Sequence, residues 1–194
     1  MLLRSVHTTT GKIIPVAGKL CRGSKATTCI SRTSVQRVLS TFEIGDKPAP
    51  GNPFHLAVPV HNMDAAREFY GGVLGLKEGR RSQDRWQDYS LFGHQLVCHY
   101  VGEDYRGADY YNPVDGDDVP VAHFGAVLSK TQFDTLVDNL NAAGTSFIIP
   151  PTLRFEGAPG EQWTMFFKDP SNNNLEFKHV THPEYLFARY DVVE

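Results

Sequence analysis

Residues 54–60 read Phe-His-Leu-Ala-Val-Pro-Val, and a similar segment, Val-Ala-His-Phe-Gly-Ala-Val-Leu, occupies residues 121–128. Each segment predicts a β-strand with one histidine, followed by a helical pattern and further extended segments. The same unit therefore occurs twice in the chain. This repetition predicts an α+β fold built from two βαβββ modules that pack as a pseudo-dimer.

The helix of the first unit is predicted over residues 63–74, because an apolar stripe runs from the candidate cap Asn62 to Gly75. The second helix is predicted over residues 130–143 and ends at Gly144. Extended segments are predicted near residues 76–82, 85–92, 95–101, 145–155, 161–168 and 174–181.

Three side chains on these strands form a candidate metal site. His55 and His123 lie on the two opening strands, and Glu176 lies on the last strand. Because side chains alternate in direction along a strand, the three converge if the modules pack as a pseudo-dimer. Two imidazoles and a carboxylate suit Fe(II), Mn(II) or Zn(II) and leave coordination positions open. Taken alone, each histidine could be a hydrogen-bonded core residue and Glu176 a solvent-facing strand residue. The joint placement of the three residues favours the metal site.

The first 42 residues differ in composition from the rest of the chain. They contain seven basic residues and no acidic one, with many Ser and Thr residues. This composition predicts an organelle presequence, mitochondrial by its arginines, with a plastid as the alternative. A basic tail that stays attached is the other interpretation. Residues 43–53 read as a linker, and residues 183–194 read as a C-terminal tail.

Without the presequence, 12 basic residues stand against 22 acidic ones, a formal net charge of −10. This balance argues against nucleic acid as a partner. Cys98 is the one cysteine outside residues 1–42, so no disulfide framework is predicted. No apolar run is long enough to predict a membrane span.

Two segments without periodicity interrupt the pattern. Residues 102–120 are rich in Asp, Tyr and Gly, and we expect an ordered or partly ordered crossover between the modules. Residues 154–160 are expected to form a second loop, which covers the cavity that the candidate metal ligands face.

Four short motifs carry a resemblance to a known family. They are Phe-Tyr-Gly-Gly-Val-Leu-Gly-Leu at 69–76, Phe-Gly-His-Gln at 92–95, His-Phe-Gly at 123–125, and Asp-Pro-Ser-x-Asn-x-Leu-Glu at 169–176. With His55, they make the chain resemble the vicinal oxygen chelate superfamily, also called the glyoxalase/bleomycin-resistance/dioxygenase group, over residues 54–180. Within it, the chain looks most like the single-domain extradiol dioxygenase-like proteins.

The resemblance implies a domain over residues 54–182, with modules 54–101 and 121–181 forming an open, cup-shaped sheet around a divalent metal. It implies His55, His123 and Glu176 as metal ligands and a small molecule as substrate. It is also compatible with a homodimer, because the cups of this family often pair.

The last strand of the first module supplies a fourth candidate ligand, and two residues compete for that role. Gln95 and His99 lie on one face of this strand and His94 on the other. The position corresponding to Glu176 falls nearest Val97, so either choice needs a shift of two residues. A site with Gln95 would resemble the epimerases of the family, and a bare triad would resemble its dioxygenases.

Other side chains are expected to line the cup. Arg154 can hold a substrate oxyanion through paired hydrogen bonds. Gln162 and Tyr70 are further polar candidates, and Phe124 is a candidate apolar wall for a planar substrate.

The resemblance implies three functions. The first is an extradiol-type dioxygenase with non-haem Fe(II), in which His99 or His94 handles protons. The second is isomerase, epimerase or lyase chemistry with a redox-inert metal. The third is a module that binds a small molecule without turnover. The family's glyoxalases use two glutamates, and the first module has none at the required position, which counts against glyoxalase activity.

Overall fold

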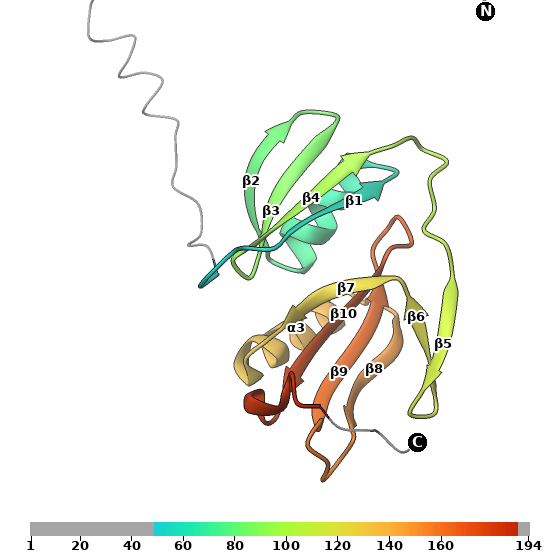
Figure 1. The fold of residues 1–194 in the computed structure, drawn as a ribbon. Helices are drawn as coiled ribbons and strands as arrows, with labels where there is room; N and C mark the ends of the chain where they lie inside the picture. The colour runs from blue at the N-terminus through green and yellow to red at the C-terminus, as the bar shows by residue number, and fades with distance from the viewer. Residues whose placement is uncertain (1–48, 190–194) are drawn as a thin grey trace, which may run out of the picture. The chain divides into compact units, whose positions relative to one another are not determined.

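Each half of the chain forms its own four-stranded sheet (Figure 1). The computed structural model describes residues 49–189. The predicted presequence lies outside the described residues and, like the organelle assignment, stays a prediction. Among the described residues, no helix has the length and apolar character needed to cross a membrane.

The first module contains one helical segment and four strands. Its elements are β1 (His55–Val60), α2 (Met63–Arg67), η1 (Glu68–Val73), β2 (Lys77–Ser82), β3 (Trp86–Leu91) and β4 (His94–Tyr100). The sheet has the order β1-β4-β3-β2, with β1 parallel to β4 and the other neighbours antiparallel.

The second module repeats this arrangement. Its elements are β7 (His123–Val127), α3 (Lys130–Ala142), β8 (Phe147–Arg154), β9 (Gln162–Lys168) and β10 (Asn174–Val180), followed by the short 3₁₀ helix η2 (Pro183–Tyr185). The order β7-β10-β9-β8 matches that of the first sheet, and β7 is parallel to β10. The predicted α+β fold of two βαβββ modules is confirmed.

Local capping explains where the helices begin. The Asn62 side chain accepts hydrogen bonds from the backbone N–H groups of Asp64 and Ala65 in α2, and Ser129 forms a capping box with Gln132 at the start of α3. The helix predicted over 63–74 is correct in extent, but its second half, η1, is a π-helical turn.

The crossover contains a hairpin that sequence reasoning missed. Strands β5 (Tyr110–Val114) and β6 (Asp117–Val121) pair antiparallel around Asp115 and Gly116. Both turn residues have positive φ, 49° and 82°, as the Asp-Gly pair of a tight hairpin turn requires. The Asp-Gly signal was present in the sequence, but prolines in both strands hide the alternation of apolar and polar residues.

One hydrophobic core joins the two modules. The rings of Phe69 and Phe167 have centroids 6.2 Å apart, and Phe167 stacks on Phe177 at 5.9 Å. The same core holds Leu96 and Leu140, both with no exposed surface. The helix-side faces of both sheets therefore pack into shared apolar contacts. We call the opposite faces, which point away from this core, the outer faces.

A buried polar cluster also connects the modules. Asp169 accepts hydrogen bonds from the Tyr70 hydroxyl and the Asn173 side-chain amide, both at 2.8 Å, and Asn173 also donates to the Pro59 carbonyl at 2.9 Å. Burial raises the pKa of the Asp169 carboxyl, although these hydrogen bonds oppose the shift.

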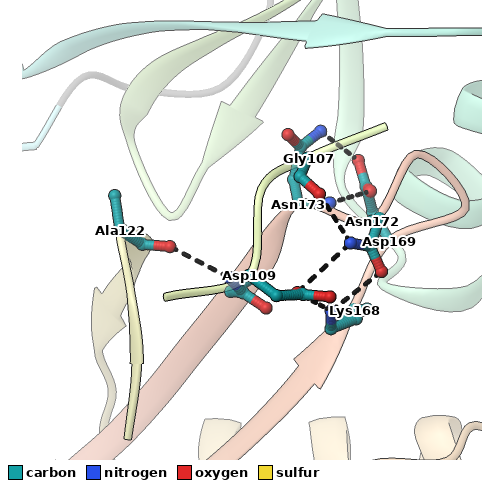
Figure 2. Close-up of polar contacts among 8 residues, drawn as sticks. Gly107, Asp109, Ala122, Lys168, Asp169, Asn172 and Asn173 are labelled. Carbon is teal, nitrogen blue, oxygen red and sulfur yellow. Dashed lines mark hydrogen bonds and ion pairs between the residues drawn. The ribbon is translucent and has the colours of Figure 1, made fainter. Parts of the chain in front are cut away.

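The same turn, residues 169–173, holds the crossover (Figure 2). The Gly107 N–H donates to the Ser171 carbonyl at 2.9 Å, and the Asn172 side chain donates to the Gly107 carbonyl at 2.7 Å. Lys168 pairs with Asp109 and donates to Asn172. The first half of the crossover is thus anchored to the turn that precedes β10.

We predict that Tyr70→Phe lowers the free energy of unfolding by about 1 kcal/mol, because a buried hydroxyl that donates to Asp169 is removed. Urea denaturation measures the loss. The control is Tyr100→Phe, at an exposed tyrosine, which should change stability by only a few tenths of that amount. Equal effects of the two substitutions would contradict this role for the Tyr70 hydroxyl.

Candidate metal centre

His123 and Glu176 come together on the outer face of the second module. Nε2 of His123 lies 3.2 Å from Oε2 of Glu176. In the parallel pairing of β7 and β10, Glu176 lies opposite Gly125. A Cβ at position 125 would lie only 1.6 Å from the Glu176 carbonyl oxygen, so the close approach of the strands at the site requires glycine.

The His123 ring is held by its other nitrogen. Nδ1 lies 2.6 Å from the Pro120 carbonyl oxygen and must donate to it. The His123 ring also packs perpendicular to the Phe166 ring, with the two centroids 5.2 Å apart. The hydrogen bond to Glu176 raises the pKa of His123, burial works against this shift, and the Pro120 carbonyl adds to it. Nε2 is therefore the nitrogen left to face a ligand.

Glu176 is held as a carboxylate by several donors. Its Oε1 accepts from the Thr164 hydroxyl at 2.7 Å and lies 3.0 Å from Nζ of Lys178. Burial alone would raise the pKa of Glu176, but hydrogen bonds from His123 and Thr164 and the charge of Lys178 lower it to about 2. The side chains of His123 and Glu176 are 30% and 11% exposed, so this anionic pair remains accessible.

His55 lies on the outer face of the first module and is exposed. Its Nδ1 is 2.8 Å from Oε1 of Gln95, the residue opposite it on β4. Within residues 49–189, no group of three or more His, Cys, Asp or Glu side chains is close enough to hold a metal ion. One chain thus brings together two of the three predicted ligands and leaves His55 apart from them.

The strand register separates the candidates for a fourth ligand. Gln95 lies opposite His55 just as Asn174 lies opposite His123, so Val97 occupies the position equivalent to Glu176. Val97 is buried and has no donor atom. His99 lies opposite Pro59, four residues along β4 from Gln95. Of the two candidates, Gln95 is therefore the one beside His55.

Three other residues predicted for the site do not lie beside His55 or His123. They are His94, His99 and Tyr70. Nδ1 of His94 accepts a hydrogen bond from the Phe54 N–H at 3.0 Å. His99 is exposed near the far end of β4, opposite Trp86. Tyr70 lies in the shared core with no exposed surface, and its hydroxyl is bonded to Asp169.

The remaining predicted residues belong to the second module. Arg154 and Gln162 lie opposite each other on β8 and β9. Arg154 is buried, and its Nη2 bonds Asp117 of the β5–β6 hairpin at 2.5 Å. Phe124 and His123 line a cavity of about 370 Å³ beneath the crossover. Substrate contacts by these residues stay predictions.

Sequence reasoning missed the residues that support the ligands. Thr164 and Lys178 hold Glu176, the Pro120 carbonyl holds His123, and Asp88 reaches the His55 side through Gln95. A period-2 pattern assigns these side chains to a face, but pairing partners across strands depend on a register that the pattern does not give.

The donor set fits a divalent transition metal. Two imidazole Nε2 atoms and one carboxylate are ligands that Fe(II), Mn(II) and Zn(II) accept, with further positions left for substrate. Each imidazole has its Nδ1 occupied by an acceptor, as metal-binding histidines commonly do.

The fold and these residues define a protein of paired βαβββ modules with a candidate metal site. Residues 53–177 match the family model described as Glyoxalase/Bleomycin resistance protein/Dioxygenase superfamily. The chain therefore belongs to this superfamily. The match covers both modules, and it leaves the reaction open because members differ in chemistry.

Solved structures agree with this assignment. A glyoxalase/bleomycin resistance protein/dioxygenase from Alicyclobacillus acidocaldarius is 34% identical, with 72% of this chain and 98% of that chain covered and a TM-score of 0.59. A glyoxalase/dioxygenase from Nostoc punctiforme is 19% identical (72% and 100% covered, TM-score 0.52). The fosfomycin resistance protein FosX from Listeria monocytogenes is 17% identical (71% and 100% covered, TM-score 0.52). These last two show the fold alone. No curated protein matches the chain.

We predict that Thr164→Val raises the pKa of Glu176 from about 2 toward the ordinary range of a glutamate, because one donor to its carboxylate is lost. A carbon-detected NMR titration of the metal-free protein measures this shift. A depressed carboxyl pKa stabilises the fold above the unfolded-state pKa, and this contribution is lost as pH falls through the folded-state pKa. The variant should therefore lose less stability than the parent on acidification.

The control is Thr135→Val, at an exposed position of α3 where the hydroxyl bonds only its own helix. This substitution should leave the pKa of Glu176 unchanged. An unchanged titration of Glu176 in Thr164→Val would mean that the hydroxyl does not help to hold the carboxylate.

Proposed function

We propose that this protein is a metal-dependent enzyme that acts on a small molecule with two adjacent oxygens, and that His55, His123 and Glu176 hold the metal. The observation that supports this most strongly is the His123–Glu176 pair, with Nε2 and Oε2 3.2 Å apart and both side chains oriented by neighbours. Such preorganisation of an accessible imidazole and carboxylate is typical of a ligand set.

We further propose that two copies of the chain complete each site, with His55 of one copy joining His123 and Glu176 of the other. The shared core directs both outer faces away from each other within one chain, which agrees with the separation of His55 from the pair. Phe54, directly before β1, is 58% exposed, and Tyr110, at the start of the hairpin that precedes β7, is 69% exposed. Exposed apolar surface of this kind is typical of an interface.

Extradiol-type dioxygenation with Fe(II) is the reaction that this ligand set supports best. Val97 at the position equivalent to Glu176 leaves three protein ligands, and therefore open positions on the metal. The bound iron would supply coordination of two substrate oxygens and of dioxygen, both atoms of which enter the ring-opened product. Lys178 and Thr164 keep Glu176 ionised, and the Pro120 carbonyl keeps the proton of neutral His123 on Nδ1. His99 and His94, the proton carriers that the sequence predicts, lie apart from both histidines of the site in one chain, and this role stays a prediction.

A second candidate is isomerase, epimerase or lyase chemistry with Mn(II) or Zn(II). It is favoured by Gln95, whose carbonyl oxygen lies beside His55 and would become a fourth ligand if the side chain turned. A module that binds a small molecule without turnover is the third.

We predict that the full-length protein, purified without oxygen or chelator, contains stoichiometric Fe(II), and that His55→Ala, His123→Ala and Glu176→Ala each lose most of it. Elemental analysis measures the metal, and circular dichroism checks the fold. His99→Ala is the control, because His99 lies away from both His55 and Gln95.

Oxygen uptake with added catechols then separates the reactions. Iron with catechol-dependent oxygen uptake supports the dioxygenase, whereas a redox-inert metal without uptake supports the second candidate. A parent protein that takes up no metal would overturn both.

We predict that mixed dimers reveal whether the site is shared. A His55→Ala chain and a Glu176→Ala chain, co-expressed with different tags, would form a heterodimer with one complete ligand set and one doubly defective set. Elemental analysis of the isolated heterodimer should find about half the metal of the parent dimer. If each site belonged to a single chain, the heterodimer would bind none.

A further inference from the structure

A line of hydrogen bonds crosses the outer face of the first module and ends at His55. Arg80 donates from Nε to Oδ2 of Asp88 at 3.0 Å, and its Nη2 forms an ion pair with the same oxygen at 3.0 Å. Asp88 Oδ2 also accepts from Nε2 of Gln95 at 3.0 Å, and Oε1 of Gln95 lies 2.8 Å from Nδ1 of His55. The residues come from β2, β3, β4 and β1, so the line spans the whole sheet.

The chemistry of these groups fixes the direction of every bond in the line. A guanidinium only donates, and an ionised carboxylate only accepts. Gln95 must therefore turn its NH₂ group toward Asp88, which leaves its carbonyl oxygen facing His55. Because that oxygen only accepts, Nδ1 of His55 must carry the proton. Nε2 of the neutral ring is then left with its lone pair exposed.

Burial and packing keep the middle of the line in place. Asp88 is only 6% exposed, so a loss of its partners would leave a carboxylate without compensation. The guanidinium of Arg80 also lies over the Trp86 ring, 5.8 Å from its centroid. The Asp88 carboxylate is therefore fixed in orientation, and by accepting from Nε2 of Gln95 it also fixes the orientation of that amide.

We propose that Gln95 and Asp88 are positioning residues that hold His55 in the Nδ1–H tautomer, so that its Nε2 is ready to bind the metal. This inference rests on the proposed function in one respect, namely that the group bound by Nε2 is the metal. Gln95 then acts through His55 and is not itself a ligand. We call the line of hydrogen bonds from Arg80 through Asp88 and Gln95 the relay. The relay orients His55 as the Pro120 carbonyl orients His123.

The tautomer can be measured without metal. Two-bond ¹H–¹⁵N NMR spectra of the metal-free, full-length protein, at a pH well above the titration range of histidine, distinguish Nδ1–H from Nε2–H in each ring. The His55 signals are assigned by their absence in His55→Ala. We expect the Nδ1–H tautomer in the parent, and a shift toward Nε2–H in Gln95→Leu.

Two further variants separate the relay from general damage to the sheet. Gln83→Leu makes the same substitution at an exposed position and should leave the His55 tautomer unchanged. In Asp88→Asn/Gln95→Glu, the amide and the carboxylate exchange places, so the relay again presents an acceptor to His55. We expect this double variant to restore the Nδ1–H tautomer, whereas Gln95→Glu alone places two carboxylates against each other.

A titration with Zn(II) then tests the consequence. We expect Gln95→Leu and Asp88→Leu to bind Zn(II) about 10- to 100-fold more weakly than the parent, the range seen when support of a metal-binding histidine is lost. An Nε2–H tautomer in the parent, or a parent-like tautomer or a parent-like Zn(II) affinity in Gln95→Leu, would overturn the inference.

The two proposals fail in different ways. If the parent shows the Nδ1–H tautomer, and Gln95→Leu changes it, but no metal binds, then the relay stands and the metal enzyme does not. If metal binds and Gln95→Leu binds it equally well, then the metal site stands and the relay is wrong.

Discussion

Burial of the helix-side faces of both sheets in one apolar core is the constraint on which the rest of the structure depends. Phe69, on the helical segment of the first module, packs on Phe167 of the second, and residues of α2, η1 and α3 belong to the same core. Since a strand shows its alternate side chains to opposite faces, the histidines that are not in the core must point away from it. The position of the candidate ligands thus follows from packing that does not involve them.

In both modules hydrogen bonds orient the candidate ligands, but the groups that make these bonds differ. In the second module, a carbonyl of the backbone orients His123 and a set of donors keeps Glu176 ionised. In the first module, side chains from three strands, β2, β3 and β4, orient His55 on β1, and no carboxylate stands at the position equivalent to Glu176. The pseudo-symmetry of the fold therefore does not extend to the electrostatics, and the charge of the ligand set is concentrated on one module.

The periodicity of apolar residues, two in strands and three to four in helices, was sufficient to predict nearly every strand and both helices, because burial of one face imposes it. It predicted which face His55 and Glu176 occupy but not that one chain keeps them apart, since a pattern within a module says nothing about which faces of two modules meet. Gln95 and His99 share a face of one strand, so only the register of β4 against β1 could separate them. The β5–β6 hairpin was hidden because Pro113 and Pro120 interrupt its strands.

The turn at 169–173 connects more of the molecule than its length suggests. It bonds the end of β1, a helix residue of the first module and the crossover, and it leads directly into the strand that carries Glu176. Its length therefore sets the register of elements that are remote in sequence, and an inserted residue would displace all of them together. A protein engineer who needed new chain termini or an inserted tag would find a more tolerant place in the exposed 156–159 loop.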